Sequence, residues 1–408
     1  MTTDAPQTGE TTVPLPTVIL KKRKALPFFS RHPWVFAGAI ARVEGDPQPT
    51  DEVVLRSHEG QFIARGLYNP ESNIRVRLYS WDENQPLDRA LWSARLDDAI
   101  ALRRKLFGKS AAGCRLVFSE SDGLSGLTID RYGDFLLVQW TSRALAARQQ
   151  VFYELLNEKL SPRGIWQRTE KGVGDAEGLE IADSLATGSE PPRPLFVEEN
   201  GLQFGVDVVE GQKTGFYFDQ RDNRAAVARY LKGASVLDMF CYTGGFSIAA
   251  AKLGDARRVR GVDSSESALD MARRNAELNG VSSQVSFEQG DAFRTLETLV
   301  AENARFDAVI LDPPKMARSR GGLERAARGY FSLNRLALDL LEPNGLLVTC
   351  SCSGLLSRED FEQILAKVAL DANRSLQVLE VRGQAADHPV SVHCVETSYL
   401  KCFICRVV

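Results

Sequence analysis

Short apolar strands alternate with helices throughout the C-terminal half of the chain, and this alternation limits the possible folds more than any other feature. We expect strands at residues 235–239, 258–263, 284–289, 308–312 and 345–350, and helices at 246–253, 266–279, 333–341 and 358–370. Consecutive strand-helix-strand units fold as a mostly parallel, doubly wound α/β sheet that binds ligands beyond the carboxyl ends of its strands. A functional site is therefore expected at that edge.

The first 190 residues follow a different pattern. Short runs at 53–55, 61–64 and 74–79 are separated by glycine, asparagine and proline, which predicts a small β barrel or sandwich. The next segment predicts an α+β domain, with helices at 91–107 and 144–160, a hairpin turning at Gly133 and Asp134, and a strand at 164–168. We expect a disordered stretch at 1–12, domains at 13–88, 89–190 and 191–408, and a proline-rich linker at 188–193.

The composition is that of a globular protein with more than one domain. Hydrophobic residues make up 44% and charged residues 25% of the 408 positions, which suits two or three packed cores. No apolar run reaches 18 residues and the first residues do not resemble a secretion signal, so we expect neither a membrane span nor export. Seven scattered cysteines favour a reducing compartment, and we expect a cytoplasmic protein.

Basic residues concentrate near the N-terminus of a chain whose net charge is −3. No acidic residue interrupts them between residues 11 and 43, so this stretch can contact phosphates, although a solvated surface explains it equally well. Cys402 and Cys405 have the spacing of half a zinc site, but there is no second such pair and we expect no metal. The basic residues are Lys21, Lys22, Arg23, Lys24, Arg31 and Arg42.

Two glycines, Gly244 and Gly245, lie between the strand at 235–239 and the helix that follows. Glycine at such a turn lets the backbone approach a ligand, and the absence of a GxGxxG pattern disfavours a dinucleotide. Asp263 ends the next strand, where a carboxylate can accept both hydroxyls of a ribose, and Asp291 follows the third strand, where it can accept an adenine amino group. Each aspartate can instead cap a helix, which is the commoner role.

These motifs resemble the ordered motifs of class I methyltransferases. The likeness covers residues 238–246, 262–265, 290–293 and 311–315. It implies S-adenosylmethionine as cofactor, with Asp263 on the ribose, Asp291 and the Ala292 amide on the adenine, and the loop at 238–245 on the methionine portion. From this loop and the end of the next strand we select Asp238, Phe240, Tyr242, Thr243, Gly244 and Ser264 as further cofactor-binding residues.

The sequence Asp312-Pro313-Pro314-Lys315 follows the fourth strand. Two prolines remove two amide donors and stiffen the loop, so a carboxylate or carbonyl can be held against a planar base; a purely structural turn is the alternative. In methyltransferases such a motif grips a nucleobase that bears an amino group. We assign Asp312 to catalysis and to cofactor binding, and Pro313, Pro314 and Lys315 to the substrate.

Cys350 and Cys352 leave the next strand at the same edge. A thiolate that adds to carbon 6 of a pyrimidine makes carbon 5 able to attack the methyl group of the cofactor; loss of the carbon-5 proton and expulsion of the thiolate complete the reaction. A free cysteine is more often a small buried apolar residue, but its place opposite the Asp312 loop favours a nucleophile. Side chains alternate along a strand, so the two sulfurs share one face until the strand ends.

The whole chain resembles the RlmI-type family of ribosomal RNA 5-methylcytosine methyltransferases. The likeness rests on motifs at residues 21–36, 64–70, 120–124, 130–134, 211–221, 349–354 and 396–401. It implies an N-terminal PUA-like RNA-binding β-barrel, a middle α+β domain and a Rossmann-like catalytic domain, with large-subunit ribosomal RNA as substrate. It also makes Cys352 the nucleophile, adds Tyr217 and Gln220 to the cofactor pocket, and implies RNA contacts for Lys21, Lys22, Arg23, Lys24 and Arg31.

Three other functions fit parts of the pattern. The first is a methyltransferase that acts on an amine or ring nitrogen of guanine in ribosomal RNA, without a covalent step. The second is a non-catalytic RNA-binding assembly factor with a vestigial cofactor pocket, and the third is a nicotinamide-dependent enzyme, which the missing GxGxxG disfavours. The sequence leaves open which nucleotide is modified, whether naked RNA or a particle is the substrate, and whether the protein forms a homodimer.

Overall fold

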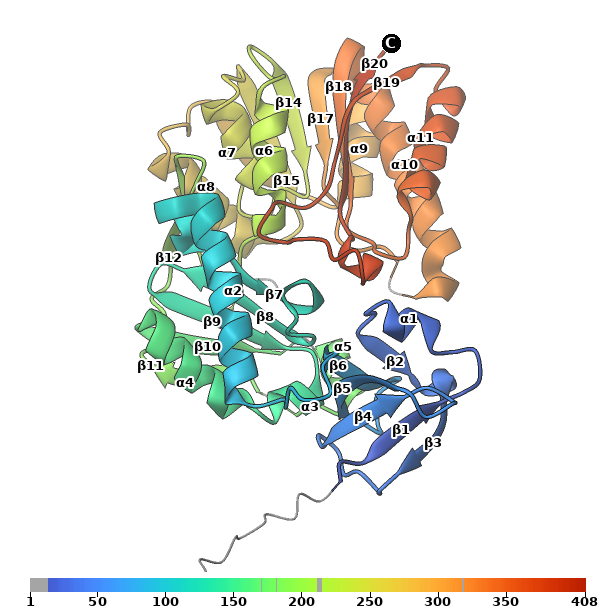
Figure 1. Ribbon diagram of the computed structural model, residues 1–408. Helices are drawn as coiled ribbons and strands as arrows, with labels where there is room; N and C mark the ends of the chain where they lie inside the picture. The colour runs from blue at the N-terminus through green and yellow to red at the C-terminus, as the bar shows by residue number, and fades with distance from the viewer. Residues whose placement is uncertain (1–13, 170, 181, 211–214, 318) are drawn as a thin grey trace, which may run out of the picture.

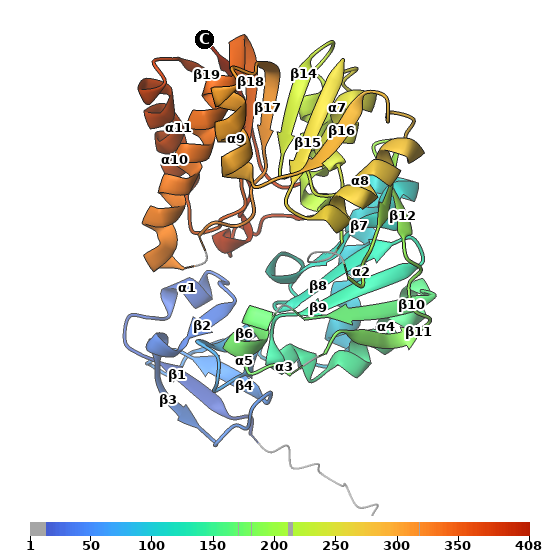
Figure 2. The same cartoon turned by 180° about the vertical axis from the view of Figure 1, so that it is seen from behind.

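The computed structural model describes residues 14–169, 171–180, 182–210, 215–317 and 319–408, and the expected disordered stretch at 1–12 lies outside them. The chain forms a small N-terminal sheet, a middle sheet covered by helices, and a C-terminal sheet between two layers of helices (Figure 1). The view from behind shows the same three parts, with the N-terminal sheet below the C-terminal helices (Figure 2). None of the described helices has the length and apolar character needed to span a membrane.

The N-terminal part is a six-stranded sheet in the order β2-β6-β5-β4-β1-β3, in which β1 and β4 are parallel and the other neighbours antiparallel. Aliphatic side chains such as Val18, Val53 and Val76 form its core. The elements are β1 (Thr17–Leu20), α1 (Leu26–Phe29), β2 (Trp34–Phe36), β3 (Ile40–Glu44), β4 (Glu52–Arg56), β5 (Phe62–Tyr68) and β6 (Ile74–Ser80).

Arg77 of β6 joins the N-terminal sheet to the middle part. Its guanidinium is buried and forms ion pairs with Glu120 (3.3 Å) and Glu177 (3.0 Å). It also donates hydrogen bonds to the Ser125 hydroxyl (3.1 Å) and the Thr141 carbonyl (3.2 Å). Because loss of one partner would leave a buried charge uncompensated, this network holds the two parts in one arrangement.

The middle part is a five-stranded sheet in the order β11-β10-β9-β8-β7. The single helix expected at 144–160 is wrong: the structure has two helices, because the chain leaves helical geometry at Arg148, whose side chain bonds to the carbonyls of Ala144 and Thr50. The elements are α2 (Arg89–Phe107), β7 (Gly113–Phe118), β8 (Leu127–Tyr132), β9 (Phe135–Trp140), α3 (Arg143–Ala146), α4 (Gln149–Leu160), β10 (Gly164–Arg168), α5 (Lys171–Glu177) and β11 (Ser184–Gly188).

The two faces of the middle sheet pack against different neighbours. Helices α2 and α4 cover one face through residues such as Trp92 and Phe152. From the other face, Tyr132 and Leu137 share a core with Phe204 of the hairpin formed by β12 (Leu195–Glu199) and β13 (Leu202–Val206). One hydrophobic core therefore continues across the predicted boundary at residue 190.

The C-terminal part contains the predicted doubly wound sheet, in the order β16-β15-β14-β17-β18-β20-β19, with only the last two strands antiparallel to their neighbours. Its strands are β14 (Ser235–Met239), β15 (Arg258–Asp263), β16 (Val285–Gln289), β17 (Phe306–Leu311), β18 (Leu341–Ser351), β19 (Leu376–Arg382) and β20 (Lys401–Val407). This fold prediction is confirmed.

Helices cover both faces of the C-terminal sheet. The cores show that α6 (Arg221–Ala228), α7 (Gly245–Lys252) and α8 (Glu266–Leu278) pack on one face, and α9 (Ala292–Ala301), α10 (Leu323–Leu340) and α11 (Arg358–Asp371) on the other. Helix α10 begins earlier than predicted, and the prediction missed its first turns because charged residues interrupt the apolar pattern there. The prediction also missed β19, because it is a half-exposed edge strand without an apolar face.

Candidate active site

The ends of five parallel strands lie side by side at one edge of the C-terminal sheet. Met239 at the end of β14 pairs with both β15 and β17. Asp263 of β15 pairs with Gln289 of β16, and Leu311 of β17 pairs with Thr349 of β18. The residues that follow these strands therefore meet at the carboxyl edge, where doubly wound sheets bind their ligands.

The loop between β14 and α7 contains three residues with a left-handed backbone, which are Phe240 (φ 65°), Tyr242 (φ 49°) and Gly244 (φ 85°). A side chain at position 244 would bring its Cβ to 3.0 Å from the ring of Phe287, so only glycine fits. At a non-glycine residue this conformation costs about 1–3 kcal/mol, and such strained residues cluster at active sites and ligand-binding loops as well as in turns. Part of the restraint comes from the Tyr242 amide, which donates to Asp263 Oδ2 (2.9 Å).

Asp238 has a buried carboxyl group that is only half paired. Its Oδ2 accepts a hydrogen bond from the Ser247 hydroxyl (2.6 Å), while Oδ1 is buried without a hydrogen-bond partner among the described residues. Burial raises the pKa of Asp238 to about 7, and the nearby charges of Asp312 and Asp263 act in the same direction. A buried acceptor of this kind needs a donor, which the amino group of a ligand can provide.

Asp263 holds the turn at the end of β15. Its Oδ1 accepts a hydrogen bond from the Ser265 amide (3.0 Å), and its Oδ2 accepts from the Tyr242 amide. Each oxygen has a further lone pair, so the carboxylate can still accept two ribose hydroxyls. Ser264 is exposed beside it, and the Ser264 carbonyl accepts the side-chain amide of Gln289 (3.0 Å).

Asp291 caps helix α9, as its commoner role would have it. Its Oδ1 accepts a hydrogen bond from the Arg294 amide (3.1 Å), and its side chain is exposed at the carboxyl edge. Ala292, the first residue of the helix, is buried beside it. The cap occupies one oxygen of Asp291, so a role toward an adenine depends on the other.

Tyr217 and Gln220 approach the edge from the segment before α6. Nε2 of Gln220 donates a hydrogen bond to Asp312 Oδ1 (3.0 Å). The rings of Tyr217 and Tyr242 meet edge to face, with centroids 5.5 Å apart, and burial raises the pKa of Tyr217. Both residues thus contact loops at the carboxyl edge, while residues 211–214 of the same motif lie outside the described residues.

Cys352 lies beside the loop that follows β17. Its Sγ is 3.9 Å from the carbonyl oxygen of Pro313. Cys352 is half-buried just beyond the end of β18; Asp312 is also half-buried, Pro313 is buried, and Pro314 and Lys315 are exposed. The structure therefore brings the two predicted catalytic residues, Cys352 and Asp312, to neighbouring loops of one edge.

Cys350 lies in a different environment from Cys352. It is completely buried in the core and lies opposite Cys402 of β20. The contact with the Cys402 thiol and burial raise the pKa of Cys350 well above its ordinary value. Since the thiolate is the nucleophilic form, Cys350 is unsuited to attack a substrate.

Tyr330 of α10 fixes both neighbours of Cys352, a role that the sequence analysis missed. Its hydroxyl is hydrogen-bonded to the hydroxyls of Ser351 (2.9 Å) and Ser353 (3.2 Å). The Ser353 hydroxyl also accepts a hydrogen bond from the Ala317 amide (3.2 Å). A tyrosine at an apolar position of a helix looks like a core residue, so only the tertiary contact identifies this role.

A buried ion pair supports both the segment that contains Tyr217 and the loop that contains Gly245, and the sequence analysis did not predict it. Arg224 of α6 bonds to both carboxylate oxygens of Glu199 (2.6 and 2.7 Å) and to the carbonyl of Tyr217 (2.8 Å). A Cβ at Gly245 would lie 3.2 Å from the Arg224 side chain, so the glycine loop rests directly on it. Neither residue belongs to a local pattern, because the pair joins the hairpin to a distant helix.

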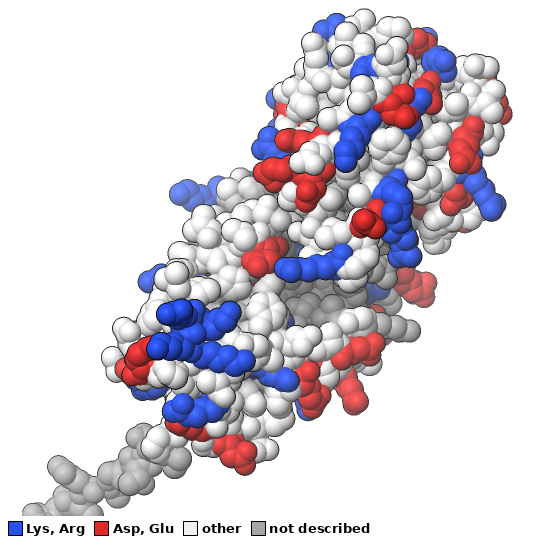
Figure 3. Space-filling model, turned by 90° about the vertical axis from the view of Figure 1, so that its right-hand side faces the viewer, with Lys and Arg blue, Asp and Glu red and all other residues white. Residues whose placement is uncertain are grey.

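All of the predicted RNA-contact residues of the N-terminal segment are exposed, in the connections on either side of α1: Lys21, Lys22, Arg23, Lys24 and Arg31. Phe29 and Phe36, on the same segment, are also exposed, at 42% and 47%. Figure 3 shows a group of Lys and Arg side chains over the N-terminal part of the molecule. Arg42, by contrast, is paired with Glu44 (2.8 Å).

One group of residues has the side chains of a metal site. The ligand atoms of His32, Cys394 and Glu396 lie within 4.8 Å of one another. However, the Trp34 amide donates to His32 Nδ1, so Nε2 carries the ring proton and donates it to Glu396. The nitrogen nearest the group therefore has no lone pair to offer a metal. Cys402 and Cys405 contribute to cores on opposite faces of the sheet, so they cannot form half a zinc site.

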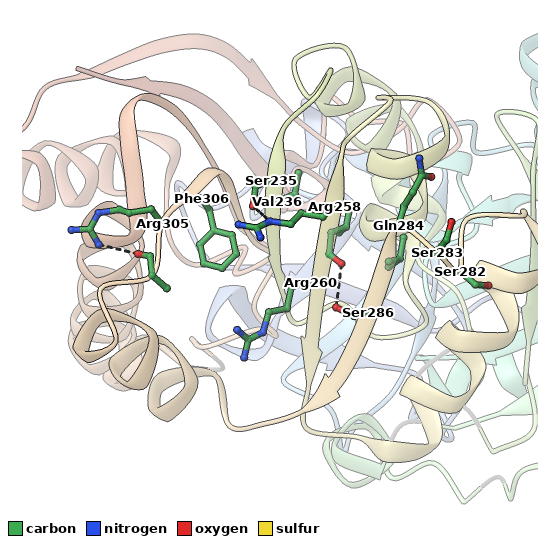
Figure 4. Close-up of a pocket in the computed structure, with 13 residues that line it drawn as sticks. Ser235, Val236, Arg258, Arg260, Ser282, Ser283, Gln284, Ser286, Arg305 and Phe306 are labelled. Atoms are coloured by element: carbon green, nitrogen blue, oxygen red, sulfur yellow. Dashed lines mark hydrogen bonds between the residues drawn. The ribbon is translucent and has the colours of Figure 1, made fainter.

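A cavity of about 520 Å³ opens at the amino edge of the C-terminal sheet, opposite the site described above. Figure 4 shows its side chains projecting from the first residues of β14, β15, β16 and β17. Arg258 and Arg260 line it, but Arg258 bonds to Ser235 (2.8 Å) and Arg260 to both oxygens of Glu288 (2.9 Å each). None of the residues predicted to bind cofactor or substrate lines this cavity.

Two protein-family models match the chain. One is described as a PUA-like domain and matches residues 18–81; the other is described as an S-adenosylmethionine-dependent methyltransferase and matches residues 182–393. Relatives include the ribosomal RNA large subunit methyltransferases I of Erwinia tasmaniensis and Aliivibrio fischeri. Each is 41% identical to this chain, and the matched region covers 96% of this chain and 99% of the relative.

A solved structure from Streptococcus mutans, provisionally assigned as an S-adenosylmethionine-dependent methyltransferase, has the same overall fold. It matches with a TM-score of 0.83 over 96% of this chain and 99% of that one, at 21% sequence identity. All three parts of the present fold therefore occur together in the same arrangement in another protein.

Proposed function

Because this chain belongs to the family of the ribosomal RNA large subunit methyltransferases I, we propose that it methylates carbon 5 of a cytosine in the RNA of the large ribosomal subunit. Its C-terminal part is that of an S-adenosylmethionine-dependent methyltransferase. What we propose is the atom that receives the methyl group and the RNA that carries it. The observation that carries it is the position of Cys352, whose Sγ is 3.9 Å from the Pro313 carbonyl at the edge that also carries the glycine loop.

S-adenosylmethionine bound at this edge supplies an electrophilic methyl group. Two features of the loop after β14 fit such a ligand: the unpaired, buried Oδ1 of Asp238, which can accept an amino group, and the left-handed Gly244, which leaves room against the backbone. Asp263 would accept the ribose hydroxyls and Asp291 the adenine amino group. The other residues that we assign to the cofactor are Tyr217, Gln220, Phe240, Tyr242, Thr243, Ser264, Ala292 and Asp312.

Asp312 and the two prolines would hold the target base. The hydrogen bond from Gln220 fixes Asp312 Oδ1, so the orientation of the carboxylate is set before a base arrives. Cytosine carries an amino group, and a carboxylate or carbonyl oxygen of this loop can accept its hydrogen bond. Pro314 and Lys315 are exposed and would contact the adjoining RNA.

Cys352 would act as the nucleophile. Its thiolate forms a bond to carbon 6 of cytosine, which moves electron density to carbon 5 and makes that atom reactive toward a methyl donor. After methylation a base removes the carbon-5 proton, the released electron pair restores the ring double bond, and the carbon–sulfur bond breaks to regenerate the thiolate. Methylation of a guanine nitrogen needs no thiolate, so the place of Cys352 favours carbon 5.

The N-terminal sheet would hold the RNA. Lys21, Lys22, Arg23, Lys24 and Arg31 are exposed and can contact phosphates, and the exposed rings of Phe29 and Phe36 can stack on unpaired bases. None of the seven cysteines, all of which lie in the described part of the chain, forms a disulfide, which suits the reducing cytoplasm where ribosomal RNA is assembled into particles.

Mass-spectrometric mapping of modified nucleotides tests this function. Large-subunit RNA from cells that lack the protein should lose one 5-methylcytosine, and purified protein with S-adenosylmethionine should restore it on that RNA. If the lost modification is a methylguanine, the enzyme uses the non-covalent route; if no methylation is lost or restored, the protein acts as an assembly factor.

A further inference from the structure

Lys401, in β20, has a buried ammonium group that forms no ion pair with any acidic residue described by the structure. The residue is 8% exposed. Its Nζ donates hydrogen bonds to the carbonyl oxygens of Ser353 (2.7 Å), Leu356 (2.7 Å) and Tyr399 (2.9 Å). Within the part of the chain that the structure describes, no carboxylate forms an ion pair with it. Because burying a charge is costly, an ammonium that is solvated only by carbonyls is an unusual choice at an ordinary core position.

The carbonyl partners of Lys401 lie on the turn that follows Cys352. Lys401 pairs with Ser351 in the ladder between β18 and β20, so its side chain reaches under residues 353–356 from the neighbouring strand. Tyr330 holds the same turn from the other side through Ser351 and Ser353. Cys352 therefore lies between two residues, Ser351 and Ser353, whose positions are fixed by hydrogen bonds, and one of the groups that fixes them is the positively charged Lys401.

The charge of Lys401 and that of a Cys352 thiolate influence each other. Burial lowers the pKa of Lys401 to about 8, a negative charge on Cys352 raises it, and the positive charge of Lys315 lowers it. The hydrogen bond of the ammonium to the carbonyl of Ser353 places the charge next to the residue that follows Cys352, and the two groups interact electrostatically. A nearby cation stabilises a thiolate, which is the reactive form of cysteine.

Among the described ionisable groups around Cys352, the only positive charge besides Lys401 is that of Lys315. Tyr217, Tyr330 and Tyr399 face it from the segment before α6, from α10 and from the chain before β20, and burial raises the pKa of all three, so they stay neutral. Asp312 and Asp219 are acidic, and Asp219 accepts the Tyr399 hydroxyl (2.5 Å). Lys315 is cationic but exposed to solvent, which screens its charge.

We propose that Lys401 is a positioning residue for methyl transfer, which holds the 353–356 turn by its three hydrogen bonds and favours the thiolate of Cys352 by its unneutralised charge. This inference rests on the proposed function, because it gives the thiolate a purpose. The reactivity of the thiol can nevertheless be measured without RNA or cofactor, so the inference is tested separately from the methylation reaction.

The test is the rate of alkylation of Cys352 by iodoacetamide from pH 6 to pH 10 in the full-length protein, followed by mass spectrometry of the peptide that contains it. In the parent protein the midpoint of the rate profile should lie below the value of about 8.5 for a free cysteine. Lys401→Met should raise this midpoint by about one pH unit, which lowers the rate near neutral pH roughly tenfold. Lys401→Arg keeps the charge and should restore most of the parent rate.

Two controls separate charge from folding. Lys315→Met removes the exposed cation and should shift the midpoint far less, while circular dichroism shows whether each variant is folded. A folded Lys401→Met protein with the parent midpoint would overturn the inference. If Lys401→Met does not fold, the parent profile decides: a midpoint at or above that of a free cysteine would overturn the inference without any variant.

Methylation assays on the same proteins distinguish this inference from the proposed function. If Cys352→Ala retains methyl transfer while Lys401→Met shifts the alkylation midpoint, the covalent mechanism fails but the effect of Lys401 on the thiol stands. If Cys352→Ala abolishes transfer and Lys401→Met leaves the midpoint unchanged, the covalent mechanism stands and the role of Lys401 is wrong.

Discussion

The Sγ of Cys352 and the carbonyl oxygen of Pro313 lie 3.9 Å apart, although the two residues follow different strands. Strands β17 and β18 are parallel neighbours, so the chain leaves both at the same edge of the sheet. A sulfur nucleophile and a rigid loop able to hold a base are thereby placed side by side.

Replacing Cys352 by alanine should lower the rate of methyl transfer by a factor on the order of 10³ or more, since removal of a catalytic nucleophile typically has effects of that size. Cys350→Ala is the matched control, because Cys350 is buried and lies in the core. It should cost about 1 kcal/mol of stability and leave most of the turnover. The measurement is transfer of labelled methyl groups to ribosomal RNA; equal loss in both variants would contradict the assignment.

Asp238 should make the stability of the cofactor-free protein depend on pH. Burial raises its pKa to about 7 in the folded state, against an ordinary value near 3.8, so between these values the folded protein binds more protons than the unfolded chain. Stability should therefore fall as pH rises from about 4 to about 7, by up to about 1.4 kcal/mol per pH unit. Thermal unfolding of Asp238→Asn should lack this contribution, and parallel pH profiles for both proteins would refute it.

Tyr330→Phe should affect both folding and catalysis, because it removes the hydroxyl that holds Ser351 and Ser353. We expect a loss of about 1 kcal/mol in stability, together with a fall in kcat as Cys352 loses its fixed position. Tyr153→Phe is the control: it removes a buried hydroxyl that is bonded to Trp140 and Gln167 in the middle domain. It should cost similar stability without changing kcat, and a similar kcat for the two variants would argue against a positioning role.

Glu199→Gln should weaken the glycine loop through Arg224. The change leaves the buried guanidinium without its carboxylate, and breaking a buried ion pair in this way lowers the free energy of unfolding by about 3–5 kcal/mol. Calorimetry should show weaker binding of S-adenosylmethionine in any variant that remains folded. Glu266→Gln breaks an exposed pair with Arg273 and should leave both the unfolding midpoint and cofactor binding unchanged.

Replacing Lys22, Arg23 and Lys24 together by alanine should weaken RNA binding at low salt. If each residue contacts one phosphate, the slope of log affinity against log salt should fall by about 0.7–0.9 per residue, because fewer counterions are released. Arg42→Ala provides a control in the same N-terminal part, since Arg42 is already paired with Glu44. An unchanged salt slope for the triple variant would show that RNA binds elsewhere.

The sequence by itself determined the fold of the C-terminal domain, and its resemblance to class I methyltransferases implied the cofactor. Strand-helix alternation and aspartates at successive strand ends predicted the doubly wound sheet and its edge, and the family models confirm an S-adenosylmethionine-dependent methyltransferase. Such signals are local: an apolar period, a glycine turn or a polar residue after a strand can be read from a few neighbouring positions. The assignments of individual site residues and the domain boundaries remain predictions.

The tertiary structure alone decided which of these residues share one site and what supports them. The family resemblance selected Cys352 of the two cysteines at the strand end, but only packing shows Cys350 in the core and Cys352 beside Pro313. Tyr330 and Lys401 reach the same turn from a distant helix and from an antiparallel strand that joins the sheet last. Contacts of this kind depend on how remote segments pack in three dimensions, and no local pattern of residues encodes them.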